Sequence, residues 1–237
     1  PNLLLEVSNP KGRSRHRPIR DGVVKSFFGH KFVRTQKESE LAQTHDHEIV
    51  SIYPFSGEEV DQLMNNSKEC VLMWATKDGW PVGVTHTFLW HDQKIWLTFA
   101  SHRHRAEAIR RDSRVSVNVS SAGYSPRAAK GLPMGAITFK GRGEFFDDEK
   151  TKLWFYPALS EKLSPTNEGA AKFFEGFLDS PLRTILAITP EKKIMYNSRN
   201  ADRHVAGTIS DEELGDRLPS DAVRMNAERG RRGLDPR

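Results

Sequence analysis

The chain has 237 residues, of which 37% are hydrophobic, and 36 Lys and Arg residues against 31 Asp and Glu residues give a net charge of +5. This small excess does not indicate a nucleic-acid-binding protein, and no apolar run approaches the ~20 residues that a membrane helix needs. Because Cys70 is the single cysteine, the chain has no internal disulfide framework, and we expect a cytoplasmic protein of one or two domains without a membrane or nucleic-acid partner.

Both ends of the chain are polar. Segment 11–20 has the sequence KGRSRHRPIR, in which five of ten residues are Lys or Arg. We interpret residues 1–50 as an N-terminal extension that wraps the body or a partner subunit, with an arm for phosphate or nucleic acid as the alternative. Residues 201–237 mix Arg with Asp and Glu and predict a polar C-terminal tail. The folded domain is therefore expected at 51–200.

The first predicted elements are a helix and a hairpin. A capping box at Ser56 and Glu59 starts a short helix. The apolar run 70–76 and the strand 81–90 flank an Asp-Gly turn, which is a strong hairpin signal. With 95–100 as a third strand, the pattern predicts an antiparallel three-stranded meander.

The remaining elements alternate short helices with strands. A helix over 101–111 precedes a strand over 114–120, and the strand 136–146 contains Gly141 and Gly143, which we interpret as bulges or kinks. Two further helices are expected over 148–159 and 167–177, and two further strands over 184–189 and 193–196. Six or seven strands with short helices between them predict a mainly β (α+β), antiparallel barrel.

The start of the helix over 101–111 is unusually basic. Ser101 takes the N-cap position, and it is followed by His102, Arg103, His104 and Arg105. The positive end of the helix dipole repels cations there unless an anion binds between them. Backbone N–H groups and guanidinium groups would converge on that anion, since Arg holds a phosphate with two parallel hydrogen bonds. The pattern predicts a phosphate site, with a solvated basic helix start as the alternative.

A metal site is a further interpretation of these histidines. His102 and His104 would have to share a metal ion with His86 or His91. Side chains two apart on a helix point in different directions, and no cysteine or acidic residue is suitably spaced. We therefore predict no metal site.

Segment 95–117, IWLTFASHRHRAEAIRRDSRVSV, resembles the strand–helix–strand signature of the pyridoxamine 5′-phosphate oxidase-like family of flavin-binding split barrels. Segments 79–81, 141–144 and 183–190 resemble further family motifs and follow in the family's order. The resemblance spans about residues 56–199. It implies a split β-barrel that forms a homodimer with flavin at the subunit interface.

The resemblance also implies where FMN binds. The backbone of the second strand would follow the isoalloxazine ring, hydroxyl side chains would contact the ribityl chain and phosphate, and Arg105 matches the family's phosphate-binding Lys or Arg. Arg103 and His104 lie where the family has a Ser-Arg pair, in a segment with one extra residue. The residues implied to bind the cofactor are Val84, Thr85, His86, Thr87, Thr98, Ser101, Arg103, His104 and Arg105.

The implied function is an FMN-dependent oxidoreductase acting on a small, cyclic or conjugated molecule. Because the flavin performs the redox chemistry, we predict no obligatory acid or base, and His86, Tyr196 and Arg199 are candidates for orienting the substrate. The true oxidase has a basic pair on the second strand, where this chain has Val84 and Leu89. Pyridoxamine 5′-phosphate is therefore not the expected substrate.

Two alternatives stay open at this point. Other branches of the family use a deazaflavin, or bind haem through C-terminal histidines, and His204 leaves haem open. A flavin- or haem-binding carrier or sensor without turnover is thus the alternative to an enzyme. A nucleic-acid-binding protein that uses the basic arm is a third class, which the lack of an aromatic-rich basic face disfavours.

Overall fold

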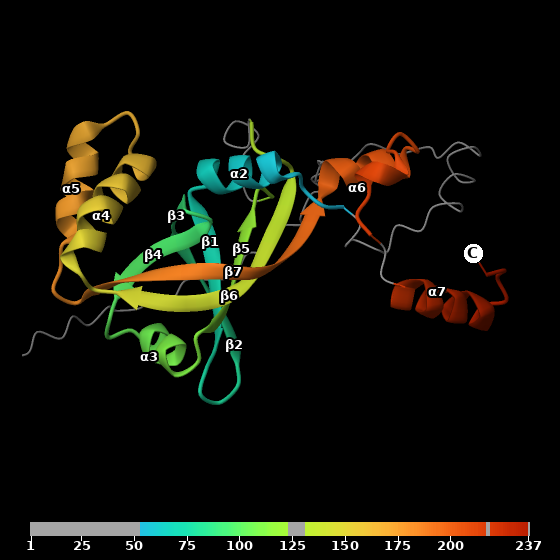
Figure 1. Ribbon diagram of the computed structural model, residues 1–237, viewed down its shortest axis with the longest axis horizontal. Helices are drawn as coiled ribbons and strands as arrows, with labels where there is room; N and C mark the ends of the chain where they lie inside the picture. The colour runs from blue at the N-terminus through green and yellow to red at the C-terminus, as the bar shows by residue number, and fades with distance from the viewer. Residues whose placement is uncertain (1–52, 123–130, 217–218, 237) are drawn as a thin grey trace, which may run out of the picture.

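The computed structural model describes residues 53–122, 131–216 and 219–236, so the predicted N-terminal extension and its basic segment lie outside the described residues. The chain forms a seven-stranded antiparallel sheet in the order β2-β1-β5-β6-β7-β4-β3 (Figure 1). The strands are β1 (Glu69–Ala75), β2 (Pro81–Thr87), β3 (Leu89–His91), β4 (Lys94–Ala100), β5 (Arg114–Ser120), β6 (Gly135–Phe146) and β7 (Arg183–Asn197). The helices are α2 (Gly57–Asn66), α3 (His104–Arg111), α4 (Glu149–Leu163), α5 (Glu168–Leu178), α6 (Ser198–Val205) and α7 (Pro219–Arg231), with a 3₁₀ turn at Asp211–Glu213.

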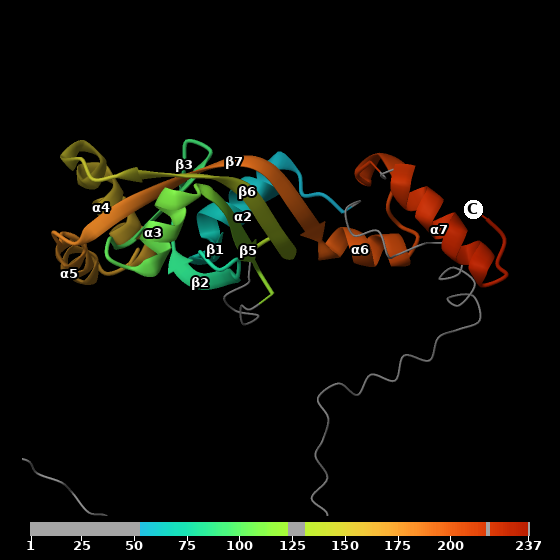
Figure 2. The same cartoon turned by 90° about the horizontal axis from the view of Figure 1, so that it is seen from below.

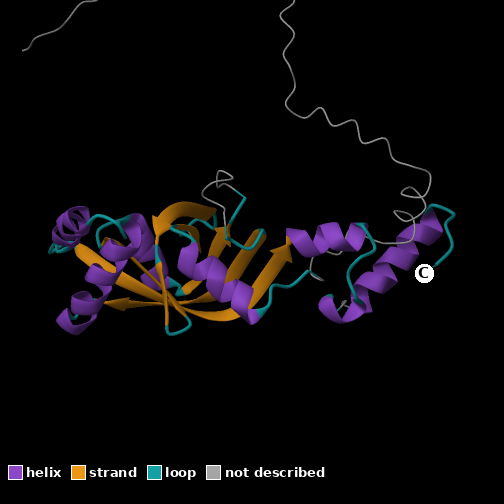
Figure 3. Cartoon of the chain, turned by 90° about the horizontal axis from the view of Figure 1, so that it is seen from above, coloured by secondary structure: helices purple, strands orange, loops and turns teal. Residues whose placement is uncertain are grey.

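The sheet curls into a half-barrel. Strands β2 and β3 stand at opposite ends of the sheet order, yet Phe88 alone separates them in the chain. The sheet must therefore bend until its two ends approach each other, and Phe88 is fully buried where they meet. The views from above and below show this curvature (Figures 2 and 3). The prediction of a mainly β, antiparallel split barrel with short helices is confirmed.

The predicted three-stranded meander is wrong. Strand β2 pairs with β1 through the Asp-Gly turn as expected, but β4 pairs with β3 and β7 and not with β2. The physical reason is the buried Phe88, which breaks the expected strand 81–90 into two strands belonging to opposite ends of the sheet. Local alternation of apolar residues does not reveal such a break.

One hydrophobic core fills the inside of the curled sheet. The inner faces of β1, β4, β5 and β6 contribute buried residues, and two helices cover this core from opposite ends (Figure 1). Helix α2 contributes Val60, Leu63 and Met64, and α3 contributes Ala106, Ala108 and Ile109. The capping box predicted at the start of α2 is present, with the Ser56 hydroxyl accepting from the Glu59 backbone N–H at 3.1 Å. Helix α3 is thus a wall of the barrel as well as a basic surface.

A second apolar layer covers the outside of β4 and β7. Helices α4 and α5 pack there around Trp96, Phe155 and Ile185 (Figure 2). Strand β4 is consequently buried on both faces, with Leu97 and Phe99 directed into the barrel and Trp96 directed toward α4.

Strands β6 and β7 form a long ribbon that extends beyond the barrel. Their register shifts between Lys140 and Gly141, which confirms the predicted bulge. A Cβ atom on Gly141 would lie 2.3 Å from the carbonyl oxygen of Thr189, so only glycine fits this crossing. Strand β7 is continuous although two strands were predicted, because β6 pairs with it on both sides of the shift. Helices α6 and α7, which follow the ribbon, were not predicted.

Among the residues that the structure describes, no helix combines the length and apolar character needed to cross a membrane.

Candidate functional site: a basic groove beside α3

A groove of about 650 Å³ lies between α3 and the β1–β2 hairpin. Its apolar wall consists of Trp74, Val82 and Val84, which point inward from the hairpin. The opposite wall is the polar side of α3. The full lining is Trp74, Thr76, Lys77, Val82, Val84, Arg103, His104, Arg105, Glu107, Ala108 and Arg111. A volume of this size and a mostly apolar wall with a few charged groups are typical of small-ligand sites.

The predicted N-cap of α3 is wrong in its position. Helix α3 begins at His104, and its N-cap is Arg103, which makes no side-chain capping bond. Ser101 instead lies in a turn: its N–H donates to the Leu182 carbonyl at 2.6 Å, and Arg103 N–H donates to the Ala100 carbonyl at 3.0 Å. This tertiary bond to Leu182 holds Ser101 before the helix. The first N–H groups of the helix, which have no partner inside it, therefore belong to residues 104 and 105, next to the groove.

Arg105 extends from the first turn of α3 into the groove and is held on three sides. Its guanidinium donates to Nε2 of His86, and its Cζ atom lies 5.4 Å from the ring centroid of Phe99 and 5.9 Å from that of Trp74. Burial, and then the neighbouring charge of Arg103, lower the pKa of Arg105. An arginine remains protonated despite such a shift, so the groove contains a partly desolvated positive charge.

His86 is the partner that orients Arg105. It lies half-buried on the inner side of β2 with its ring 5.7 Å from that of Phe99. Burial, followed by repulsion from Arg105, lowers the pKa of His86 from 6.5 to about 4. The imidazole is therefore neutral at pH 7, and its Nε2 atom accepts the Arg105 hydrogen bond.

The charges of the groove suit an anionic ligand with an apolar ring. The lining contains four cations, Lys77, Arg103, Arg105 and Arg111, and one carboxylate, Glu107. Within the described part of the chain, none of the four cations forms an ion pair with a carboxylate. Arg111 donates to a neutral acceptor, the Ala75 carbonyl, at 3.3 Å. FMN combines a phosphate with a large conjugated ring, so this donor set and apolar wall fit it.

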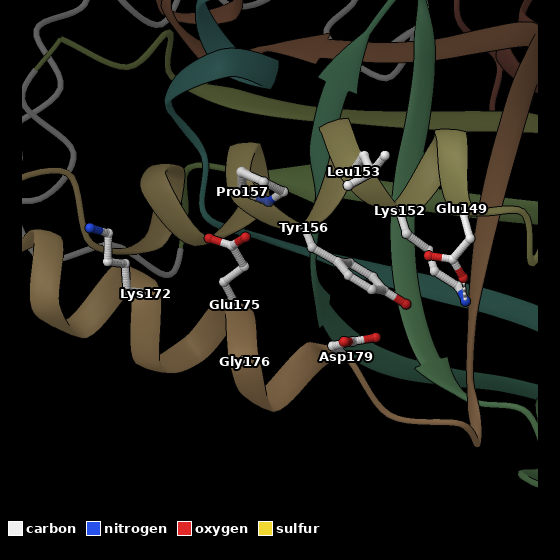
Figure 4. A pocket seen from close by; sticks show the side chains of 9 residues that line it. All are labelled: Glu149, Lys152, Leu153, Tyr156, Pro157, Lys172, Glu175, Gly176 and Asp179. Carbon is white, nitrogen blue, oxygen red and sulfur yellow. Dashed lines mark hydrogen bonds and ion pairs between the residues drawn. The ribbon is translucent and has the colours of Figure 1, made fainter.

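A second cavity, of about 440 Å³, lies between α4 and α5. Figure 4 shows Tyr156 of α4 pointing toward Asp179, with Glu175 of α5 to its left. Its lining carries three acidic and two basic side chains, and Lys152 is bonded to Glu149 at 2.6 Å. Burial raises the pKa of Tyr156. This mixed lining does not favour an anion.

The family model described as pyridoxamine 5′-phosphate oxidase matches residues 56–195. This chain belongs to that family. The matched segment begins at the N-cap of α2 and ends in β7, so it includes the curled sheet, α3 and the groove.

Several solved structures are similar to this chain. A conserved hypothetical protein from Mycobacterium tuberculosis matches with 18% identity and a TM-score of 0.53, over 72% of this chain and 96% of that chain. An FAD-binding protein from Mesorhizobium loti has 21% identity and a TM-score of 0.41, over 59% and 92%. The heme storage protein HutZ from Vibrio cholerae has 13% identity and a TM-score of 0.44, over 59% and 94%. No curated protein matches this chain.

Some of the residues that the family resemblance implied for cofactor binding lie at the groove. Val84, Arg103, His104 and Arg105 line it, and His86 is bonded to Arg105 beside it. Thr85 and Thr87 alternate with His86 along β2, so their side chains point away from the barrel interior. Neither threonine lines the groove.

Thr98 and Ser101 are not brought to the groove. Thr98 is buried on the face of β4 that α4 covers, where its hydroxyl donates to the Thr184 carbonyl at 2.8 Å. Ser101 lies in the turn before α3, bonded through its N–H to the Leu182 carbonyl.

The candidate substrate-orienting residues are also separated. Tyr196 and Arg199 lie at the far end of β7 and in α6, whereas the groove is near the other end of β7, where Arg183 pairs with Ala100. Tyr196 makes an edge-on contact with the ring of Tyr53 at 6.0 Å. His86 alone of the three candidates lies beside the groove.

The histidines considered for haem or metal have other surroundings. His204 is buried, and its Nδ1 atom is 2.8 Å from the Tyr53 hydroxyl. His91 lies against Trp154, with ring centroids 4.8 Å apart. Within the described residues, no three His, Cys, Asp or Glu side chains are grouped as a metal site.

Sequence reasoning missed several residues of the groove: Trp74, Lys77, Val82, Glu107 and Arg111. Val82 follows from the same strand alternation as Val84, and Arg111 lies two helical turns beyond His104 on the same side of α3. Trp74 had no such signal, because its contact with the guanidinium of Arg105 joins β1 to α3.

Proposed function

We propose that this protein is an FMN-dependent oxidoreductase acting on a small, cyclic or conjugated molecule. The observation that supports it is the groove, in which four cations without carboxylate partners among the described residues face an apolar wall. A phosphate dianion and an aromatic ring would satisfy both sides at once. Family membership supports a flavin as the ligand, although a shared fold does not by itself decide the ligand.

Arg103 and Arg105 would hold the phosphate, together with the N–H groups that begin α3. The side chains of Val82 and Val84 would pack on the isoalloxazine ring. Strand β2 pairs with β1 alone within the described sheet, so its other edge has backbone N–H and C=O groups free of strand partners. Along residues 84–87 these groups would bind the polar edge of the ring.

When bound, FMN supplies the electron or hydride transfer. The residues of this chain bind and orient it, and they place positive charge near its phosphate. His86 is neutral and acts as a hydrogen-bond acceptor toward Arg105, so no obligatory proton transfer is assigned to it. By the resemblance, Val84 and Leu89 take the place of a basic pair in the true oxidase, which argues for a substrate other than pyridoxamine 5′-phosphate. Leu89 was expected on the second strand with Val84 but lies in β3.

We also propose that the protein is a homodimer with flavin at the interface. The outer face of the sheet has an uncharged centre that runs across five neighbouring strands. Depletion of charge is typical of the centre of an interface. The patch consists of Val71, Met73, Gly83, Thr85, Ser116, Asn118, Ala136, Thr138 and Ile194.

The dimer is tested by sedimentation of the wild type and of Thr85→Arg, which places a charge in the patch. The expected result is a dimeric wild type and a monomeric variant. Leu153→Arg, on the exposed side of α4, is the control and should leave the dimer intact. A monomeric wild type, or a Thr85→Arg protein that remains dimeric, would contradict the proposal.

The cofactor is tested by mass spectrometry of the small molecules that co-purify, and by titrating apoprotein with FMN while flavin fluorescence is measured. Retention of FMN with quenching of its fluorescence is expected. A deazaflavin or haem in the purified protein would replace FMN as the cofactor. FMN binding without turnover of any electron acceptor would favour a carrier or sensor over an enzyme.

A further inference from the structure

The contact between His86 and Arg105 joins two side chains that both carry positive charge when protonated. His86 comes from the inner side of β2 and Arg105 from the first turn of α3. Phe99 of β4 packs against both, with its ring 5.7 Å from that of His86 and 5.4 Å from the guanidinium carbon. The contact can form only while the imidazole is neutral, with its proton on Nδ1 and its lone pair on Nε2.

The surroundings of His86 keep it neutral. The positive charge of Arg105 faces it from α3, and Arg103 is a second positive charge that acts on Arg105. From β1, Cys70 is the cross-strand neighbour of His86, and burial raises the pKa of its thiol to about 12, so it contributes no negative charge. Among the described residues, no carboxylate forms an ion pair with His86 or Arg105.

A neutral acceptor has a different effect on Arg105 from a carboxylate. Both restrict the guanidinium to one orientation, but a carboxylate also cancels its charge and occupies two of its N–H groups. The imidazole takes one N–H group, so the positive charge and the remaining N–H groups stay available to a ligand. Because the guanidinium also lies over Phe99 and Trp74, its position is fixed before any ligand binds.

We propose that His86 is a positioning residue, which orients the Arg105 guanidinium toward the phosphate of the bound cofactor without neutralising it. This inference rests on the proposed FMN site. It assigns His86 a role that acts through Arg105, in place of direct contact with the substrate. It also explains why a histidine and an arginine are neighbours in a partly buried groove.

Three substitutions of His86 separate orientation from charge. His86→Gln keeps a neutral acceptor and should bind FMN within about threefold of the wild type. His86→Glu keeps an acceptor but adds a negative charge, and His86→Phe removes the acceptor while preserving a ring against Phe99. Because Glu cancels the charge of Arg105 and Phe leaves its guanidinium without an acceptor, we expect both variants to weaken FMN binding about tenfold or more. Fluorescence titration gives the dissociation constants, and His91→Phe is the control that should not change them.

The second readout is the coupling between the two residues. In an Arg105→Ala background, His86→Phe should have no further effect on FMN affinity, because the residue it positions is gone. An undiminished loss in that background would overturn the proposal, since His86 would then act on its own. Equal FMN affinities of the His86→Gln and His86→Glu variants would also overturn it. This comparison tests the proposal even if the His86→Phe variant does not fold. Failure of the proposed function is distinct: the wild type itself would not bind FMN.

Discussion

The two cavities differ less in the number of their charges than in how those charges are paired. In the α4–α5 cavity, Lys152 is bonded to Glu149 at 2.6 Å and Lys172 to Glu168 at 3.0 Å. In the groove beside α3, Arg105 is bonded to a neutral imidazole and Arg111 to a backbone carbonyl. Cations of the first kind are neutralised by the protein itself. Cations of the second kind are held in place and keep their charge for a ligand.

The difference shows what makes an anion site. Arginine and lysine are common on protein surfaces, and most form ion pairs of little energetic consequence. Cations that the protein does not neutralise attract an anion more strongly when an apolar wall beside them lowers the local dielectric constant. The groove has that combination and the α4–α5 cavity does not, so substitutions that affect FMN binding should separate the two regions.

Removing both arginines at the start of α3 has the largest expected effect. Arg103→Ala combined with Arg105→Ala deletes two charged donors, each worth about 1.5–3 kcal/mol. We expect FMN affinity to fall about 100-fold or more, since about 1.4 kcal/mol corresponds to a factor of ten. Fluorescence quenching or isothermal titration calorimetry measures the loss.

The matched control removes two cations from the other cavity. Lys152→Ala combined with Lys172→Ala changes the net charge by the same amount but breaks ion pairs that the chain already satisfies. FMN affinity should stay within about twofold, because neither lysine lines the groove and each is already paired with a carboxylate. If both double variants lost affinity equally, the groove would not be the binding site.

Two glycines, one near each cavity, test how closely the surrounding residues are packed. A Cβ atom at Gly143 of β6 would lie 2.9 Å from Leu186 Cδ1 and 3.1 Å from Ile109 Cγ2 of α3, both buried. Gly143→Ala should therefore push α3 outward and reduce the free energy of unfolding by about 1–3 kcal/mol. FMN binding should weaken as well. A urea unfolding curve as stable as that of the wild type would show that α3 is not packed this closely.

Gly176 of α5 is the counterpart in the α4–α5 cavity. A Cβ atom there would meet nothing within 4 Å, and the residue lies inside a helix. Gly176→Ala should raise the free energy of unfolding by about 0.5–1 kcal/mol, because glycine is a poor helix former. In one set of urea unfolding curves, we expect Gly143→Ala to lower the free energy of unfolding and Gly176→Ala to raise it. A loss of stability in Gly176→Ala would contradict the open cavity beside α5.

Local signals in the sequence predicted the parts of the fold that local physics determines. The capping box at Ser56, the Asp-Gly hairpin and the bulge at Gly141 each depend on a few neighbouring residues, and each is confirmed. The pattern of short strands also indicated the barrel. The basic start of α3, identified from its conflict with the helix dipole, is one wall of the groove.

The predictions that were wrong, and the contact that was missed, concern features that depend on residues far apart in the sequence. Ser101 has a good N-cap side chain, but its bond to Leu182 places it before the helix. Phe88 looks like one more residue in a strand, and only its burial between the ends of the curled sheet divides β2 from β3. The pairing of His86 with Arg105 joins β2 to α3, and no spacing in the sequence indicates it.

Adjacent arginines near the end of α3 provide the most local test. Arg111 lines the groove, whereas the guanidinium carbon of Arg110 lies 4.6 Å from the ring centroid of Phe145, on another side of the helix. Arg111 does not hold the phosphate directly in the proposed site, so its contribution is mainly Coulombic, about 1 kcal/mol at contact distances in water. Arg111→Ala should weaken FMN binding about fivefold at low salt, and this difference should shrink as salt screens the charge. Arg110→Ala removes the same charge one residue earlier and should leave the dissociation constant unchanged. Equal losses in both variants, measured by fluorescence titration at two salt concentrations, would mean that the overall charge of α3 attracts the ligand and that the groove gives Arg111 no special position.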